Sequence, residues 1–354
     1  MNPLDLPLAS QSTPTVRAYS SDDATRWEDF VTRCPAATFF HRIGWRSIMQ
    51  DVLRHRAWYL LAERGDTIVG VLPLAEVKSV LFGHALVSLP FAAYCGVATT
   101  DPVAGESLTQ EAVALAKKLN VRHLELRNQT PQMLDWPRQD LYVTFRKEIL
   151  PEVEANMLAI PRKQRAMVRK GIQRGLVAQV DTNVDRFFEL YADNVHRHGT
   201  PALPKKYFEA LLRIFGSDCD VQIVTAPDGT PISGVLTFHF RDEVLPYYAG
   251  DALDARALGA NDFKYWELMR RACERGFKVF DYGRSKRATG SFDFKKNWGF
   301  EPQQLHYEYN LVRGDGIPQN NPSNPKYSAV ISIWRKLPRP VVDVLGPFIV
   351  RNLG

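Results

Sequence analysis

Three stretches in the second half of the chain decide the fold: YYAG at residues 247–250, DYGR at residues 281–284 and FDFKKNWGF at residues 292–300. The first ends a predicted strand over residues 244–250, and the second ends a predicted strand over residues 277–282. Between them the apolar spacing predicts a helix over residues 260–275, closed by Gly276. The third stretch is expected to form a hydrophobic turn. This order of strand, helix and strand favours an α+β fold.

The same plan continues to both sides of these stretches. Strands are expected at 221–226 and 232–240, after helices at 151–174, 184–196 and 205–215. The first half repeats the order, with helices at 22–33 and 43–53, two strands within 57–78, a helix at 105–119, and strands at 15–19, 121–127 and 141–148. We therefore expect a disordered N-terminus at 1–14, domains at 15–150 and 151–312, and a Pro/Asn-rich linker with a basic tail at 313–354.

Composition is that of a soluble globular protein. The 354 residues are 45% hydrophobic and 24% charged, and the net charge of +6 permits an anionic substrate. Residues 79–100 carry no formal charge, but their Gly and Pro residues favour buried strand, turn and strand over a membrane helix. Neither a disulfide framework nor a zinc site is predicted from the four scattered cysteines, which fit a reducing, cytoplasmic compartment.

Motifs of several large enzyme classes are missing. The chain has no G-x-S-x-G, no phosphate loop of the G-x-x-x-x-G-K type, no G-x-G-x-x-G and no H-E-x-x-H. This argues against serine hydrolases, kinases with such loops, dinucleotide enzymes and zincin proteases. His196 and His198 flank Arg197 without a nearby carboxylate or thiolate, so no metal site is predicted.

Two basic features could hold an anionic donor. The loop with Arg256, Gly259 and Asn261 precedes a predicted helix, whose free N–H groups suit a phosphate; an ordinary capped loop is the alternative. It is weakly similar to the loop with which GNAT acyltransferases hold coenzyme A. Arg165 and Arg169 lie in a run of basic residues that would share one helix face; this run could meet RNA or only water.

Lys295 lies between aromatic residues and could be held stiffly. An ammonium so placed can stabilise the oxyanion that develops in acyl transfer, whereas the alternative is a solvated lysine pair with Lys296.

The chain resembles the FemAB family of peptidyltransferases over residues 16–312. Four stretches carry the resemblance: 38–45, 161–177, 191–208, and the set formed by 247–250, 281–283, 294–295 and 298–299. It is most similar to the FemAB-like proteins that accompany exosortase/PEP-CTERM and exopolysaccharide systems. The resemblance implies two tandem GNAT-like domains with mixed sheets flanked by helices. Two departures are that no lysine follows Trp45 closely and that no long charged helical arm is inserted in the second domain.

The resemblance also implies site residues. The catalytic candidates are Lys295, Phe294 and Asp281, with Asp281 as a positioning group. The candidates for substrate binding are Tyr247, Tyr248, Arg197, Arg284 and Trp45. The loop and the basic run described above, rather than the resemblance, supply the candidates for the donor phosphates: Arg256, Gly259, Asn261, Arg165 and Arg169.

The implied activity is transfer of an aminoacyl or other acyl group to an amine on an envelope or exopolysaccharide precursor, a glycan or a peptide. No cofactor is expected to stay bound; the donor is aminoacyl-tRNA or an acyl thioester such as acyl-CoA. A non-catalytic scaffold of a polysaccharide or exosortase system is the remaining alternative. The basic amphipathic tail at 326–354 either packs on its own domain or makes peripheral contact with the inner membrane. Pro338, Pro340 and Pro347 are expected to break any long helix there.

Overall fold

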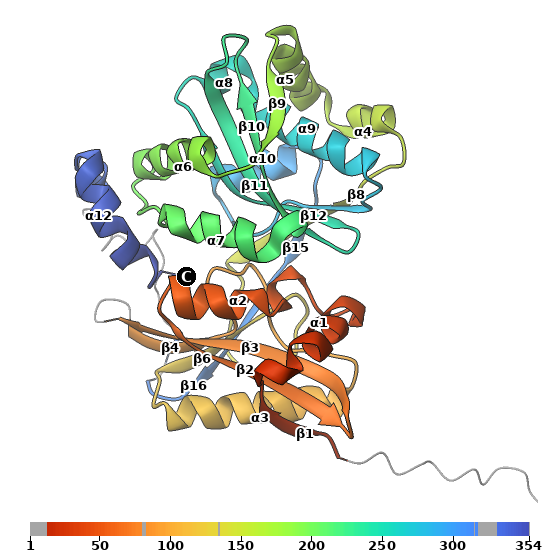
Figure 1. The fold of residues 1–354 in the computed structure, drawn as a ribbon, viewed down its shortest axis with the longest axis vertical. Coiled ribbons are helices and arrows are strands. Elements are labelled where there is room, and N and C mark those ends of the chain that lie inside the picture. The colour runs from red at the N-terminus through yellow and green to blue at the C-terminus, as the bar shows by residue number, and fades with distance from the viewer. Residues whose placement is uncertain (1–12, 80–82, 134, 315, 318–330, 354) are drawn as a thin grey trace, which may run out of the picture.

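Two large sheets, stacked along the long axis of the molecule, form the framework (Figure 1). The computed structural model describes residues 13–79, 83–133, 135–314, 316–317 and 331–353. The structure confirms the expected α+β architecture of two mixed sheets flanked by helices. Most of the N-terminus predicted to be disordered at 1–14, residues 1–12, and most of the predicted linker lie outside the described residues.

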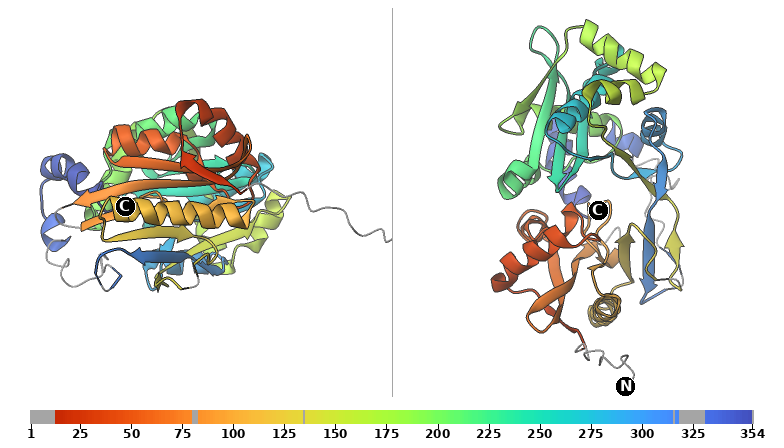
Figure 2. Two further views of the ribbon diagram at one scale, coloured as in Figure 1. Left: turned by 90° about the horizontal axis from the view of Figure 1, so that it is seen from below. Right: turned by 90° about the vertical axis from the view of Figure 1, so that its right-hand side faces the viewer.

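The first sheet has the strand order β1-β2-β3-β4-β6-β16-β7, with β5 paired to β3. Its strands are β1 (Thr15–Ala18), β2 (Arg56–Arg64), β3 (Thr67–Ser79), β4 (Gly83–Val87), β5 (Ala98–Thr99), β6 (His123–Asn128), β7 (Arg138–Gln139) and β16 (His306–Leu311). Three short 3-10 or π turns and three helices accompany this half: η1 (Ser21–Asp23), α1 (Ala24–Arg33), η2 (Phe39–His41), α2 (Gly44–Ser47), η3 (Ile48–Val52) and α3 (Pro102–Lys118). Helices α1 and α2 cover one face and α3 covers the other (Figures 1 and 2).

The second sheet has the order β14-β8-β13-β12-β11-β10-β9, with β15 paired to β8. Its strands are β8 (Tyr142–Glu148), β9 (Val177–Asp181), β10 (Cys219–Thr225), β11 (Pro231–Phe240), β12 (Glu243–Asp251), β13 (Val279–Asp281), β14 (Ser285–Lys286) and β15 (Pro302–Gln304). The helices of this half are α4 (Val153–Ala159), α5 (Arg162–Gln173), α6 (Asp185–Arg197), α7 (Lys205–Phe215), η4 (Gly216–Asp218), α8 (Ala255–Leu258), α9 (Ala260–Glu274) and α10 (Gly290–Asn297), followed by α12 (Arg339–Val350) near the C-terminus.

The two sheets exchange strands across the sequence. Strand β8, which precedes the expected boundary at 150/151, pairs with β13 of the second sheet, Glu148 opposite Val279. Strand β16 returns to the first sheet and pairs with β6, His306 opposite Asn128. The sheets therefore do not divide the chain at the expected boundary, because each takes one strand from beyond it.

Local sequence explains most element ends. Asp101 caps α3 by accepting from the amides of Val103 and Ala104, and Pro102 follows it as the first helical residue. Pro161 separates α4 from α5, so the single helical region expected at 151–174 is two helices. The turn expected around Phe294 is instead helix α10, which Thr289 caps by accepting from the amide of Phe292. Helix α12 is only 12 residues long and begins directly after Pro338. Pro347 lies inside it and does not interrupt it.

The largest apolar core lies between the two sheets. Phe39 stacks on Phe238 at 4.3 Å between ring centroids, and Trp45 packs beside them with no exposed surface. Aromatic burial of this kind joins the halves into one body.

The uncharged stretch at 79–100 is buried strand and loop where it is described, as expected. Strand β4 and residues such as Leu89 and Cys95 are part of it. In the described part of the chain, no helix combines the length and apolar character that a membrane crossing requires.

Candidate functional site

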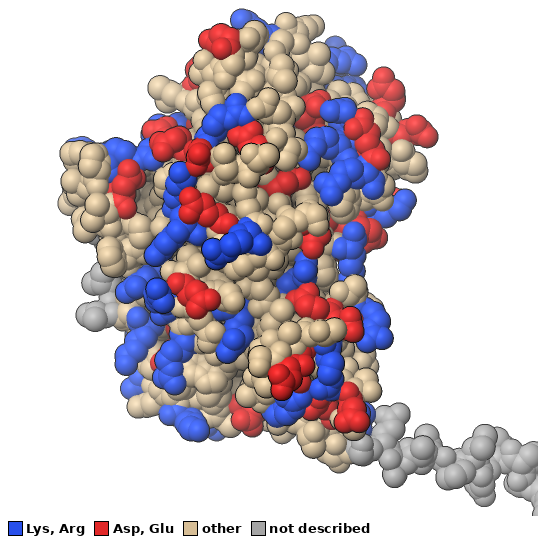
Figure 3. Space-filling view, viewed as in Figure 1, with Lys and Arg blue, Asp and Glu red and all other residues tan. Residues whose placement is uncertain are grey.

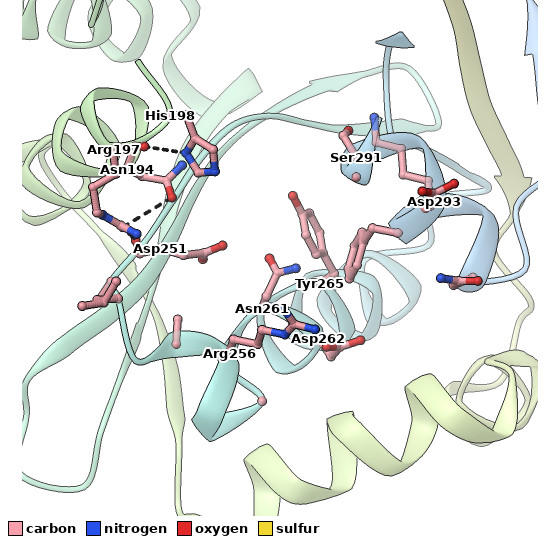
Figure 4. A pocket seen from close by; sticks show the side chains of 18 residues that line it. Asn194, Arg197, His198, Asp251, Arg256, Asn261, Asp262, Tyr265, Ser291 and Asp293 are labelled. Atoms are coloured by element: carbon pink, nitrogen blue, oxygen red, sulfur yellow. Dashed lines mark hydrogen bonds between the residues drawn. The ribbon is translucent and has the colours of Figure 1, made fainter. Parts of the chain in front are cut away.

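A cleft of about 840 Å³ opens in the second half of the chain at the end of β12. Strands β12 and β13 are parallel but pair only at Glu243–Val279 and Val244–Phe280, so the remainder of β12 continues to Asp251 without this neighbour. The end of α6, the α8–α9 turn and α10 complete the wall (Figure 4). Six residues singled out from the sequence line this cleft: Arg197, Arg256, Gly259, Asn261, Phe294 and Lys295.

One wall is the turn between α8 and α9. Gly259 has φ +74°, and a Cβ on it would lie 2.7 Å from the carbonyl oxygen of Met167 in α5. Only glycine fits this backbone without strain. The turn leaves the first amides of the 15-residue helix α9 at the cleft, next to the exposed side chain of Arg256. Such a wall suits an anion.

The opposite wall holds Lys295 on α10. Its side chain is buried, and Nζ donates to the carbonyl oxygens of Tyr282 at 2.6 Å, Gly283 at 3.0 Å and Arg284 at 3.2 Å. Burial lowers the pKa of Lys295 to about 7; Asp281 opposes this shift and the charge of Arg284 adds to it. The lysine is therefore a fixed group beside the cleft and not part of a solvated pair.

Asp251, at the end of β12, was not singled out from the sequence. Its Oδ1 accepts from Lys264 Nζ at 2.8 Å and from the Ser233 hydroxyl, and both of these donors are buried. In the described part of the chain, no hydrogen bond reaches its Oδ2. Figure 4 shows the carboxylate extending from β12 toward the middle of the cleft. Its backbone oxygen accepts from Arg197, which also pairs with Asp193 at 2.8 Å.

Tyr265 is a second lining residue that sequence reasoning missed. Its ring packs against Tyr282 at 4.8 Å and Phe294 at 5.6 Å, and its hydroxyl points into the cleft (Figure 4). Burial raises its pKa, so the phenol stays protonated at neutral pH. The signal was the spacing of four between Asn261 and Tyr265, which puts both on one face of α9.

Asp281 lies outside the cleft lining and has no exposed surface. Its carboxylate accepts from Arg146 at 2.7 Å, Thr144 at 3.0 Å, the Gly283 amide at 2.7 Å and the hydroxyl of Tyr94. With four donors it joins a loop of the first half to the second sheet, which is a structural task. Because Asp281 does not line the cleft, any positioning role would act through the residues that it holds and not through contact with a substrate.

The aromatic residues expected to bind substrate also lie elsewhere. Tyr247 donates to the carbonyl oxygen of Phe91 at 2.6 Å, and Tyr248 shares a 2.9 Å hydrogen bond with the hydroxyl of Tyr207. Trp45 belongs to the core between the sheets, so a substrate cannot touch it. The sequence resemblance placed Trp45 at the site because it matches positions in the chain, and it does not show whether the side chain is buried in the core.

Arg284 and the basic helix are near the cleft without lining it. The guanidinium of Arg284 lies 4.6 Å from the ring centroid of Tyr142 and donates to the Tyr307 hydroxyl at 3.0 Å. Arg165 and Arg169 surround a separate hollow of about 390 Å³ on α5, together with Arg162. Gly259 contacts the side of α5 that carries Met167, Lys170 and Gly171. At helical spacing the three arginines lie on the other side of α5, so this basic surface faces away from the α8–α9 turn.

Residues 159–296 match the family model described as an acetyltransferase (GNAT) domain, and this range contains every residue that lines the cleft except Asn297, the last residue of α10. Among proteins of curated function, no sequence matches the chain.

Solved structures share the whole two-domain architecture. FemX is 14% identical with a TM-score of 0.63, covering 90% of this chain and 100% of its own. The C-terminal domain of a putative lysylphosphatidylglycerol synthetase from Agrobacterium fabrum is 15% identical with a TM-score of 0.58, covering 83% and 92%. A tandem GNAT protein from the clavulanic acid biosynthesis pathway is 12% identical with a TM-score of 0.53, covering 86% and 100%.

These comparisons establish a tandem GNAT fold of the kind seen in FemX, as the resemblance implied, with the match to the GNAT domain model in the second half. The cleft lies within that matched domain.

Proposed function

We propose that the protein transfers an aminoacyl or other acyl group from an activated donor to an amine on an envelope or exopolysaccharide precursor. The observation that carries this proposal is a single cleft with the turn at Gly259 and the start of α9 on one wall and the buried amine of Lys295 on the other. The turn would hold the phosphates of the donor, which places the acyl carbonyl between these walls.

In the proposed reaction the acceptor nitrogen attacks the donor carbonyl carbon. A C–N bond forms, the C–O or C–S bond to the donor breaks, and the nitrogen loses a proton while the leaving oxygen or sulfur gains one. The positive charge of Lys295 would stabilise the oxyanion electrostatically. A direct hydrogen bond to the oxyanion would require Nζ to release one of its three carbonyl partners, and the longest of these bonds is the one to Arg284. The free Oδ2 of Asp251 would accept a hydrogen bond from the neutral acceptor amine and so orient its lone pair, and the Tyr265 hydroxyl lies in the same space.

Two donors fit the turn. An acyl thioester of coenzyme A would use its diphosphate at Gly259 and Arg256, whereas aminoacyl-tRNA would also reach the arginines of α5. Titration calorimetry with coenzyme A and electrophoretic shift with aminoacylated tRNA separate them. Binding of either one supports acyl transfer; binding of neither leaves the scaffold of a polysaccharide or exosortase system as the function.

We place this reaction in the cytoplasm. Cys34, Cys95, Cys219 and Cys273 are all free thiols in the structure, which suits a reducing compartment.

A further inference from the structure

The C-terminal segment at 331–353 carries the densest exposed apolar surface of the described chain. Twelve large hydrophobic side chains are exposed in the described residues, and six of them lie in this segment: Ile333, Val341, Val344, Leu345, Phe348 and Leu353. Soluble proteins rarely gather such side chains without a partner.

Helix α12 is apolar on two opposite faces. Val342, Gly346 and Val350 are buried against the body, whereas Val341, Val344, Leu345 and Phe348 point outward. At helical spacing these two sets lie on opposite sides. Phe348 is 63% exposed and Val344 is 65% exposed, so among the described residues the outward face has no partner that buries it. Figure 3 shows this segment, at the left edge, as largely uncharged surface.

The helix is fixed to the body. The carbonyl oxygen of Arg351 bonds to the His55 ring at 2.7 Å, and that of Trp334 bonds to the His196 ring at 3.0 Å. Trp334 itself is buried. The outward face is therefore presented rigidly and does not depend on a folding step at the moment of docking.

The segment has an excess of basic side chains, although Arg339 is paired with Asp343 at 2.8 Å and with Glu189 of α6 at 3.6 Å. Arg335, Lys336, Arg339 and Arg351 lie in the segment with a single acidic residue, Asp343, and the Arg351 guanidinium is 5.8 Å from the centroid of the Phe348 ring. A second copy of the chain would bring the same positive charges opposite these ones. An anionic lipid surface offers an apolar interior with negative charges around it, which matches both features.

We propose that the outward face of α12 docks the protein on the surface of an anionic bilayer. The docked segment also contacts the cleft: Arg335 donates to the carbonyl oxygen of His198 at 3.1 Å, and His198 lines the cleft with Arg197. Docking would hold this wall next to the lipid headgroups.

The test is co-sedimentation of the full-length protein with vesicles of phosphatidylcholine alone or mixed with phosphatidylglycerol. We expect binding to the mixed vesicles only, weakened by salt, and a loss of about tenfold or more for the Val344→Asp/Phe348→Asp variant. The matched control is Val103→Asp/Leu158→Asp, which places the same charges at two exposed apolar residues on α3 and α4 and is expected to bind as wild type.

Wild-type protein that stays in the supernatant with anionic vesicles would overturn the docking proposal, as would an equal loss in the control. A dimer in light scattering that Val344→Asp/Phe348→Asp converts to a monomer would assign the face to a second copy instead. Because no outcome involves catalysis, a failure here is distinct from a failure of the acyl-transfer proposal.

Discussion

The ammonium nitrogen of Lys295 lies 2.6 Å from the carbonyl oxygen of Tyr282, at the point where the chain leaves β13. Two further carbonyls, of Gly283 and Arg284, complete its partners. The lysine thus joins α10 to the end of the strand and at the same time brings its charge to the edge of the cleft. Its structural role and its proposed catalytic role belong to one side chain, and separating them requires different measurements.

Lys295→Met tests the protonation of this group through stability. The folded pKa of about 7 lies below the ordinary 10.5, so between these values the unfolded chain binds a proton that the folded chain does not. Stability therefore rises with pH in this window, by about 1 kcal/mol per unit, and is independent of this group below pH 7. In urea unfolding, the unfolding free energy of wild type relative to that of Lys295→Met should be larger at pH 9 than at pH 7. If the difference in unfolding free energy between the two proteins stays constant with pH, the lowered pKa of Lys295 is contradicted.

Asp281→Asn tests the structural role of the buried carboxylate. The substitution weakens the partnership with Arg146 and puts an amide where Tyr94 needs an acceptor, so we expect a loss of about 3 kcal/mol in unfolding free energy. Tyr94→Phe should cost less, about 1 kcal/mol, because only one donor is removed. If Asp281→Asn kept full stability but lost activity, Asp281 would be a catalytic group and its structural role would be refuted.

Gly259→Ala tests the turn that would hold the donor phosphates. A Cβ here meets the left-handed backbone and the Met167 carbonyl oxygen at 2.7 Å, so we expect a loss of about 2–3 kcal/mol and weaker donor binding. Gly229→Ala is the matched control, because Gly229 also has positive φ (+86°) but no atom within 4 Å of the added carbon. Its cost should be about 1 kcal/mol. Equal melting temperatures of the two variants would show that α5 does not constrain the turn.

Arg256→Ala tests the charge at the same turn. The side chain is exposed, so stability should be unchanged, whereas affinity for coenzyme A or for aminoacylated tRNA should fall about tenfold. Arg213→Ala on α7, also exposed but outside the cleft, serves as the control for net charge. Calorimetry with coenzyme A and gel shift with aminoacylated tRNA measure the affinity of both variants. If Arg256→Ala keeps the wild-type affinity for both donors, Arg256 is not part of the donor site.

Local patterns in the sequence predicted most helices and strands, because hydrophobic periodicity and helix-capping residues are recognisable within a few consecutive residues. The exchange of β8 and β16 was beyond such reading: Glu148 and Val279 are opposite each other across a distance in sequence that no local signal spans. Helix α10 was missed because its aromatic residues resemble a hydrophobic turn until the cap at Thr289 is recognised.

Half of the candidate site follows from the sequence for a similar reason. Arg256, Gly259 and Asn261 are close in the chain, so one loop brings them together. Tyr247 and Trp45 were placed at the site by resemblance, but tertiary packing decides whether an aromatic residue faces a cleft or a core. Asp251 was missed although it directly follows YYAG, because its buried partner Lys264 comes from a different element.

The most direct test of the central claim compares acylated products by mass spectrometry of glycans and envelope precursors. The cells carry the wild-type gene, a deletion, Lys295→Met or Lys296→Met, with protein levels matched; Lys296 is the exposed neighbour on the same helix. The account predicts one amine-bearing species that gains an acyl mass with wild type and Lys296→Met and loses it with the deletion and Lys295→Met. The same product in undiminished amount from folded Lys295→Met would contradict it.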